Sequence, residues 1–274
     1  MPHPLDSAIA KVNWAKEHIG NLNGLIESFY NSKPYEIGSE EDVDRGERRV
    51  YLVKVTEVPV AISLAGGDII HNLRSALDHA AFQFVYKDTG GKGIPSNKDP
   101  FKHVYFPIFD GAQEYINGKM RNISGAGQKS IDAIDATEPY KGGKGHRLWQ
   151  IHRMDILDKH RLALMAFGGS EDFLDIGAVA ALTRPVIIPQ PPGPERPIMQ
   201  QRFIIRGKSL VCPLKVGRVL HIEPLDFKPD QKLTFTLHVA FNEPGIIECE
   251  PVIKVLHETA NLVGNIIESF TPFF

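Results

Sequence analysis

The hydrophobic pattern of this chain of 274 residues changes from mainly helical to mainly strand-like after Gly168-Gly169. Before this point apolar residues recur mainly at helical spacing, whereas after it short β-rich runs alternate with turns. Because the helical and strand patterns are segregated along the chain, the sequence predicts an α+β fold. We expect a helical bundle over residues 1–168 and, over residues 169–274, an antiparallel β-rich region that ends in a helix and packs with the bundle as one unit.

The expected elements can be placed from periodicity and from the positions of Gly and Pro. Helical spacing predicts four helices in the first region, over residues 5–31, 60–87, 112–137 and 146–165, the third interrupted near Gly125 and Gly127. A β-hairpin is expected over residues 34–58, with an acidic turn around Ser39–Gly46. In the second region we expect strands at 173–182, 199–206, 209–213, 217–223 and 231–241, and a final helix over about 250–270.

Charge and cysteine content exclude several classes of protein. The net charge is −2, so no overall positive field indicates nucleic-acid binding, although a local basic patch is compatible with it. Cys212 and Cys249 are far apart and form no C-x-x-C pattern, which argues against a thiolate zinc site and against a disulfide framework. The first residues lack the apolar core of a signal peptide. No apolar run approaches the roughly 18 residues of a membrane span, so we expect a cytoplasmic protein without a membrane partner.

The helix expected over residues 60–87 carries polar residues of an unusual kind. At about 100° per residue, a core face forms from Ile69, Leu73, Ala76, Leu77, Ala80 and Phe84. The other faces hold Asp68, Asn72, Ser75 and His79 on one flank, and His71, Arg74 and Asp78 opposite the core. A solvated face usually consists of strong helix formers such as Lys, Glu and Gln. The pattern therefore indicates either a functional site or a polar seam between helices, in which Arg74 and Asp78 pair four residues apart.

The helix expected over residues 146–165 has a second polar cluster. Asp155 and Lys159 project into its apolar face, and His152 and Asp158 lie at the edges of that face. A carboxylate on an apolar face is unfavourable unless it is paired. Asp155 could pair with Lys159 four residues on, or with groups of the first helix. We therefore expect the two helices to touch through His71, Arg74, Asp78, Asp155 and Asp158.

Arg74 and His79 form the pattern R-x4-H, which resembles the signature of the HEPN superfamily of helical-bundle proteins. The resemblance implies a metal-independent ribonuclease, or a related phosphodiester-handling protein, that acts on RNA as a homodimer. It implies that Arg74 holds phosphate and that His79 is an acid or base. We expect His71 and Asp78 to complete the catalytic set, with a substrate-contacting or supporting group formed by Asn72, Asp155, Asp158, Lys159 and His160.

The five-residue spacing sets a geometric condition, because residues i and i+5 lie about 140° apart on a helix. Arg74 and His79 can serve one substrate only if a groove wraps around the helix. The longer pattern, HNLRSALDH followed by LDKHR, is also similar to a group of bacterial proteins of unassigned function. That similarity implies a shared fold and site.

Two other functions fit the same residues. A metal-dependent hydrolase or oxygenase could hold a divalent transition metal between the two helices. Its ligands would be His71, Asp78, His152, Asp155 and Asp158, although His-Glu-x-x-His and Glu-x-x-His patterns are absent. Alternatively, the polar helix pair is architectural and the protein is a non-catalytic module that binds a ligand or partner. The ribonuclease hypothesis requires no cofactor.

Overall fold

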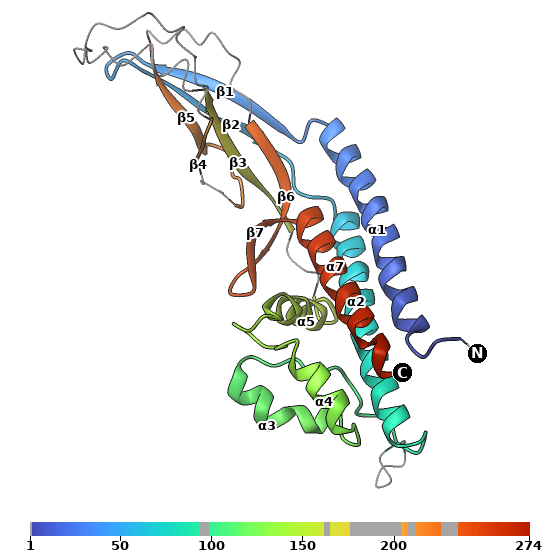
Figure 1. Cartoon of the computed structure of the whole chain (residues 1–274). Coiled ribbons are helices and arrows are strands. Elements are labelled where there is room, and N and C mark those ends of the chain that lie inside the picture. The colour runs from blue at the N-terminus through green and yellow to red at the C-terminus, as the bar shows by residue number, and fades with distance from the viewer. Residues whose placement is uncertain (1, 94–98, 162–164, 176–203, 208–211, 226–234) are drawn as a thin grey trace, which may run out of the picture. The chain divides into compact units, whose positions relative to one another are not determined.

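Figure 1 shows the computed structural model of the chain, which describes residues 2–93, 99–161, 165–175, 204–207, 212–225 and 235–274. Over these residues the fold contains six α-helices and antiparallel strands. A β-hairpin follows the first helix, and a strand-rich region precedes the last helix. The α+β class predicted from the sequence is confirmed.

The described residues form two compact units that each combine distant parts of the chain. Unit 1 comprises residues 1–32, 58–165 and 241–274, and unit 2 comprises residues 33–57 and 166–240. The last helix thus groups with the first helices, and the hairpin groups with the later strands. This grouping does not follow a single boundary at residue 168.

Three long helices form the centre of unit 1 (Figure 1). They are α1 (Asp6–Asn31), α2 (Val60–Asp88) and α7 (Val252–Phe270), and each contacts the other two. Apolar residues at helical spacing bury one stripe of each helix. The Phe84 ring on α2 is fully buried, with its centroid 5.0 Å from that of Phe270 on α7. Burying a side chain of this size contributes about 2 kcal/mol, so the aromatic contacts fix α2 against α7.

Helix α5 (His146–Asp158) packs on α2 and is anchored at its first turns. The Arg147 guanidinium donates to both carboxylate oxygens of Glu250, at 2.7 and 3.2 Å. The Gln150 side-chain amide donates to the Ile246 carbonyl at 2.7 Å. Glu250 lies in strand β7 (Ile247–Pro251), which directly precedes α7 in the chain, and Ile246 is the residue before β7. These bonds hold the face of α5 that carries His152 and Asp155 toward α2.

Residues 104–110, which precede α3, lie beside α5 and have no regular secondary structure apart from an isolated bridge at Phe109. Phe106 in this segment is fully buried, and Asp110 accepts a hydrogen bond from the Trp149 indole of α5 at 2.7 Å. Helices α3 (Ala112–Asn122) and α4 (Gln128–Asp135) follow in the chain. The Tyr115 hydroxyl of α3 donates to Asp135 of α4 at 2.6 Å, which joins the two helices. The segment around residues 104–110 therefore forms one wall beside α2 and α5.

Unit 2 contains an antiparallel sheet of order β1-β2-β5, with β1 (Tyr35–Asp42), β2 (Glu47–Val55) and β5 (Val219–Pro224). The β1–β2 turn ends at Gly46, whose φ of 67° favours glycine. Arg48 on β2 pairs with Glu41 and Glu223 on the flanking strands, both at 3.0 Å.

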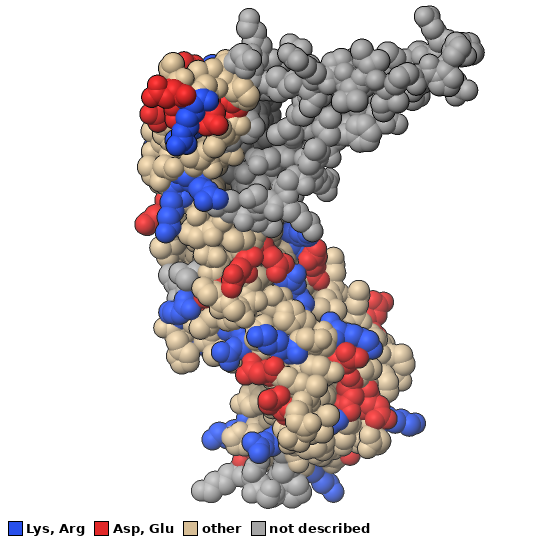
Figure 2. Space-filling model, turned by 90° about the vertical axis from the view of Figure 1, so that its left-hand side faces the viewer, with Lys and Arg blue, Asp and Glu red and all other residues tan. Residues whose placement is uncertain are grey.

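On the face drawn in Figure 2, Lys and Arg side chains are interspersed with Asp and Glu and form no single basic face.

A second sheet has the order β4-β3-β6-β7. Its remaining strands are β4 (Ile204–Gly207), β3 (Met165–Asp175) and β6 (Phe235–Glu243). Strand β6 matches the strand expected at 231–241, and β5 matches the one expected at 217–223. Strand β7 was not expected, whereas α7 matches the helix expected over about 250–270. Two other expected strands are described in part: residues 173–175 of the strand at 173–182 lie in β3, and residues 204–206 of the strand at 199–206 lie in β4. Of the strand expected at 209–213, residues 212–213 are described and form no strand, and the rest of these three strands lies outside the described residues.

The expected end of the second polar helix is wrong. Helix α5 ends at Asp158, not at residue 164 or 165, and β3 begins at Met165 and includes Gly168-Gly169. Arg161, in the turn after α5, donates to both carboxylate oxygens of the buried Glu243, at 2.8 and 3.2 Å. This pair stabilises a departure from the helix that local spacing does not reveal.

Within the described part of the chain, no helix is long and apolar enough to cross a membrane.

Candidate functional site

Arg74 lies at the centre of the contact between α2 and α5. Its side chain is buried and donates three hydrogen bonds within the protein. The Nε group donates to His152 Nδ1 at 3.2 Å, Nη1 to Asp78 Oδ1 at 2.5 Å and Nη2 to the Phe106 carbonyl at 2.9 Å. We call Arg74, Asp78, His152 and Phe106 the Arg74 network. The predicted contact between the two helices is therefore present, and the bond from Arg74 to His152 is part of it.

Asp78 links the Arg74 network to the segment of residues 104–110. Its Oδ1 atom accepts from the Phe106 backbone N–H at 2.8 Å as well as from Arg74. Burial raises the pKa of Asp78 even though the Arg74 charge and the Phe106 N–H oppose this shift. Arg74 and Asp78 thus bind the carbonyl and the amide of one residue, which fixes residues 104–110 beside α2.

His152 is held as a neutral imidazole. Burial and the adjacent Arg74 charge lower its pKa from 6.5 to about 4. Because Nδ1 accepts from Arg74, the ring carries its proton on Nε2. His152 therefore offers an uncharged N–H donor at neutral pH and is a poor proton acceptor.

Asp155 joins the helices at a second point. It is 4% exposed; Oδ1 lies 2.8 Å from His71 Nδ1, and Oδ2 accepts from Lys159 Nζ at 2.7 Å. Burial raises the pKa of Asp155, but the hydrogen bonds from Lys159 and His71 outweigh it and hold the pKa below its usual value. The side chains of His71 and Lys159 are 55% and 56% exposed. Both partners considered for Asp155 from the sequence are thus present together.

The other predicted site residues lie around these two contacts. Asp158 packs against α2 at Gly67, where a Cβ atom would lie 2.5 Å from its Oδ2 atom. Asn72 accepts from Lys11 of α1 at 3.0 Å. His160 is exposed in the turn after α5. Asp158 therefore shares the α2–α5 contact, whereas Asn72 faces α1.

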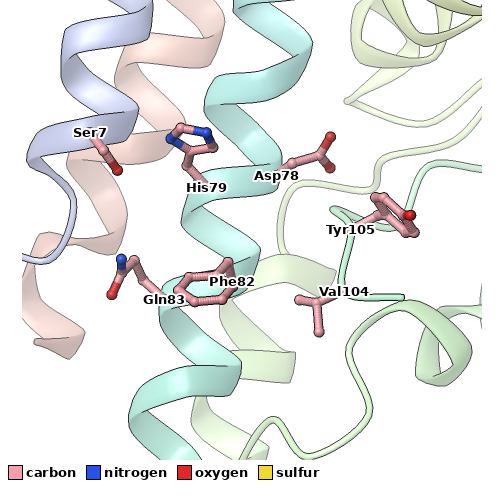
Figure 3. Close-up of a pocket in the computed structure, with 7 residues that line it drawn as sticks. All are labelled: Ser7, Asp78, His79, Phe82, Gln83, Val104 and Tyr105. Atoms are coloured by element: carbon pink, nitrogen blue, oxygen red, sulfur yellow. The ribbon is translucent and has the colours of Figure 1, made fainter. Parts of the chain in front are cut away.

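Two cavities of about 420 Å³ each open beside α2. The first, which we call the Arg74 cavity, is lined by Arg74, Asp78, Tyr105, Phe106, Ile108, Phe109, Asn122, His152, Asp155, Ile156 and Lys159. The second, the His79 cavity, is lined by Ser7, Asp78, His79, Phe82, Gln83, Val104 and Tyr105 (Figure 3). In Figure 3 the side chains of Asp78 and His79 project to different sides of α2. Asp78 and Tyr105 line both cavities, so the two hollows adjoin.

A third hollow of about 140 Å³ extends the surface past α5 toward α3. It is lined by Ile108, Phe109, Asp110, Glu114, His152 and Arg153, and so shares three residues with the Arg74 cavity. The three cavities of unit 1 share lining residues, and we refer to them together as the α2 track. Sequence reasoning did not identify Tyr105, Phe106 or Asn122 of this track. Phe106 acts through its backbone atoms, which leave no side-chain signal.

Three of the five alternative metal ligands contact cations of the protein. Asp78 faces the Arg74 guanidinium, Asp155 faces Lys159, and His152 Nδ1 accepts from Arg74. Among the described residues, no three His, Cys, Asp or Glu side chains form a group that could hold a metal ion. No protein-family model, curated protein or solved structure matches the chain.

Proposed function

We propose that the protein binds single-stranded RNA along the α2 track and cleaves it without a metal. The observation that supports this proposal is that Asp78 and Tyr105 line both large cavities. Arg74 and His79 project from different sides of α2, and the five-residue spacing requires a groove around the helix. The adjoining cavities supply such a groove. A substrate that crosses Asp78 and Tyr105 would meet both sides.

Cationic and neutral donors in the track suit a phosphodiester backbone. Lys159 is more than half exposed at the Arg74 cavity, and Arg153 lines the third hollow. Both would contact phosphate oxygens. His152 adds an uncharged N–H donor. Arg74 uses three of the five N–H groups of a guanidinium within the protein, so its main role in this proposal is to position these donors.

His79 is the proposed acid or base. Metal-independent cleavage removes a proton from the 2′-hydroxyl as its oxygen attacks phosphorus, and supplies a proton to the leaving 5′ oxygen. Histidine is suited to this exchange near neutral pH. His79 lines a cavity that also contains Ser7 and Gln83 as polar neighbours. We further propose a homodimer, as the HEPN resemblance implies, which light scattering would detect.

A labelled single-stranded RNA of about 20 nucleotides, assayed in excess EDTA, tests the proposal. We expect His79→Ala to slow cleavage about 100-fold or more while binding persists, because acid–base catalysis contributes on that scale. Lys159→Ala should weaken binding and reduce its salt dependence, because one phosphate contact is lost. His257→Ala on α7 and Lys129→Ala on α4 remove exposed side chains of the same types and serve as controls.

Three results would contradict the proposal. Cleavage at the parental rate by the His79→Ala variant would remove the proposed acid or base. A stoichiometric transition metal, together with loss of activity in EDTA, would favour the metal-dependent hydrolase or oxygenase. Failure of the parent to bind RNA would favour a binding module for another ligand.

A further inference from the structure

His71 and Ser75 lie on α2 outside the lining of the three cavities, and Asp155 of α5, which lines the Arg74 cavity, contacts His71; together they suggest covalent chemistry independent of RNA cleavage. His71 Nε2 lies 3.5 Å from Ser75 Oγ, while His71 Nδ1 lies 2.8 Å from Asp155 Oδ1. A carboxylate, an imidazole and a hydroxyl in this order are the parts of an activated serine nucleophile. We propose that Ser75 attacks activated acyl or phosphonyl esters, with His71 as its base and Asp155 as the group that orients His71.

The Asp155 carboxylate sets the tautomer of His71. Asp155 is 4% exposed, and Lys159 holds its other oxygen at 2.7 Å. An ionised carboxylate can only accept a hydrogen bond, so His71 carries its proton on Nδ1. The lone pair of the neutral ring then lies on Nε2, the atom that faces Ser75. This is the arrangement that a general base requires.

The hydroxyl of Ser75 differs from those of Ser28 on α1 and Thr259 on α7. Each of these two donates to the carbonyl four residues earlier, at 2.9 and 2.7 Å. That bond is the usual way in which a helical hydroxyl is satisfied. Within the described residues, the Ser75 hydroxyl instead contacts the His71 ring. The 3.5 Å separation is long, and such contacts shorten when substrate binds.

The position of Ser75 limits its substrates. Backbone N–H groups near the middle of α2 donate within the helix, so they do not supply an oxyanion hole. Stabilising the oxyanion matters least for esters with good leaving groups. We therefore expect reaction with activated esters at modest rates, and no peptide hydrolysis. The exposed His71 side chain leaves the site open to such small electrophiles.

The proposed reaction transfers an acyl group to Ser75 and then to water. Ser75 Oγ bonds to the carbonyl carbon while its proton passes to His71 Nε2. The bond from carbon to the leaving oxygen then breaks, and that oxygen takes the proton from His71. Water attacks the acyl-Ser75 ester by the same route, which releases a carboxylic acid and restores the hydroxyl. With a fluorophosphonate, Ser75 Oγ displaces fluoride from phosphorus, and the phosphonyl group remains on the serine.

A fluorophosphonate probe on the full-length protein tests this inference. Intact mass should show one phosphonyl group per chain, and peptide mass spectrometry should place it on Ser75. We expect Ser75→Ala to abolish labelling and His71→Ala to slow it at least tenfold. Ser28→Ala and His257→Ala, which change exposed residues of the same types, should label like the parent. A burst of p-nitrophenol from p-nitrophenyl acetate, equal to the protein concentration, should accompany labelling.

The inference is overturned if the parent is not labelled, if the label lies on another residue, or if His71→Ala reacts at the parental rate while circular dichroism shows it folded. The His79→Ala variant separates this inference from the proposed function. It should lose RNA cleavage but label like the parent, so either proposal can fail without the other.

Discussion

Acidification should destabilise this protein through the neutral imidazole of His152. Its pKa is about 4 in the folded chain against an ordinary 6.5, so the unfolded state binds the additional proton between these values. Stability therefore rises with pH across this window and is lost as pH falls from 6.5 toward 4. For one such group, the free energy of unfolding falls by about 2 kcal/mol between pH 7 and pH 5.

The change that isolates this effect is His152→Asn. The asparagine Oδ1 atom can take the place of Nδ1 and accept from Arg74, but it does not titrate. Charged neighbours of His152 also bear on its titration, chiefly Arg74, Asp155, Arg153 and Lys159. These neighbours remain in the variant, so the difference between the two pH profiles isolates His152.

Urea unfolding at pH 7, 6 and 5, followed by circular dichroism, measures the two profiles. We expect the variant to lose about 2 kcal/mol less than the parent over this range, with equal slopes against urea concentration. The same substitution at the exposed His257 should leave the profile unchanged. Parallel profiles for the parent and the His152→Asn variant would refute the assignment of His152 as a buried neutral donor.

Four substitutions test the packing around the site and the core, each measured by urea or thermal unfolding. Arg74→Met should lower the free energy of unfolding by about 3 kcal/mol, because it leaves Asp78 half-enclosed without its cation. Phe84→Ala should cost about 3–5 kcal/mol, because the ring is fully buried. Gly118→Ala should cost about 1–3 kcal/mol, since its Cβ would collide with the Phe109 ring. Tyr115→Phe should cost about 1 kcal/mol through loss of the bond to Asp135.

Hydrophobic periodicity was sufficient to predict the long elements. Helices α1 and α2 lie within one residue of their expected bounds, and the β1–β2 hairpin lies within three, because each has many repeats of one period. The end of α5 was not predicted, because the pair between Arg161 and Glu243 acts across 82 residues of sequence. Strand β7 was missed for a related reason. It has five residues, too few to show a period before α7 begins.

The polar contacts of the site were predictable only where they involve helical side chains. A helical projection was enough to bring Asp155 toward His71, and Arg74 toward Asp78. It could not identify Phe106, whose carbonyl and amide complete the Arg74 network. Nor could it identify Tyr105, which lies in an irregular segment without a period of its own. The track around α2 depends on both residues, so the sequence predicted a site but not its shape.

The structure also separates two roles that the sequence could not distinguish. Hydrogen bonds between enclosed polar groups stabilise the fold, and removing one group leaves its partner unsatisfied. The bonds from Arg74 to Asp78 and His152 are of this kind. An exposed group that donates one hydrogen bond to a buried partner still presents its remaining polar sites to solvent. His71 and Lys159 belong to this kind, because each donates to Asp155 and has a side chain more than half exposed. A hydrogen-bonded network and an accessible polar surface are therefore not alternatives on α2, since Asp155 positions both exposed groups.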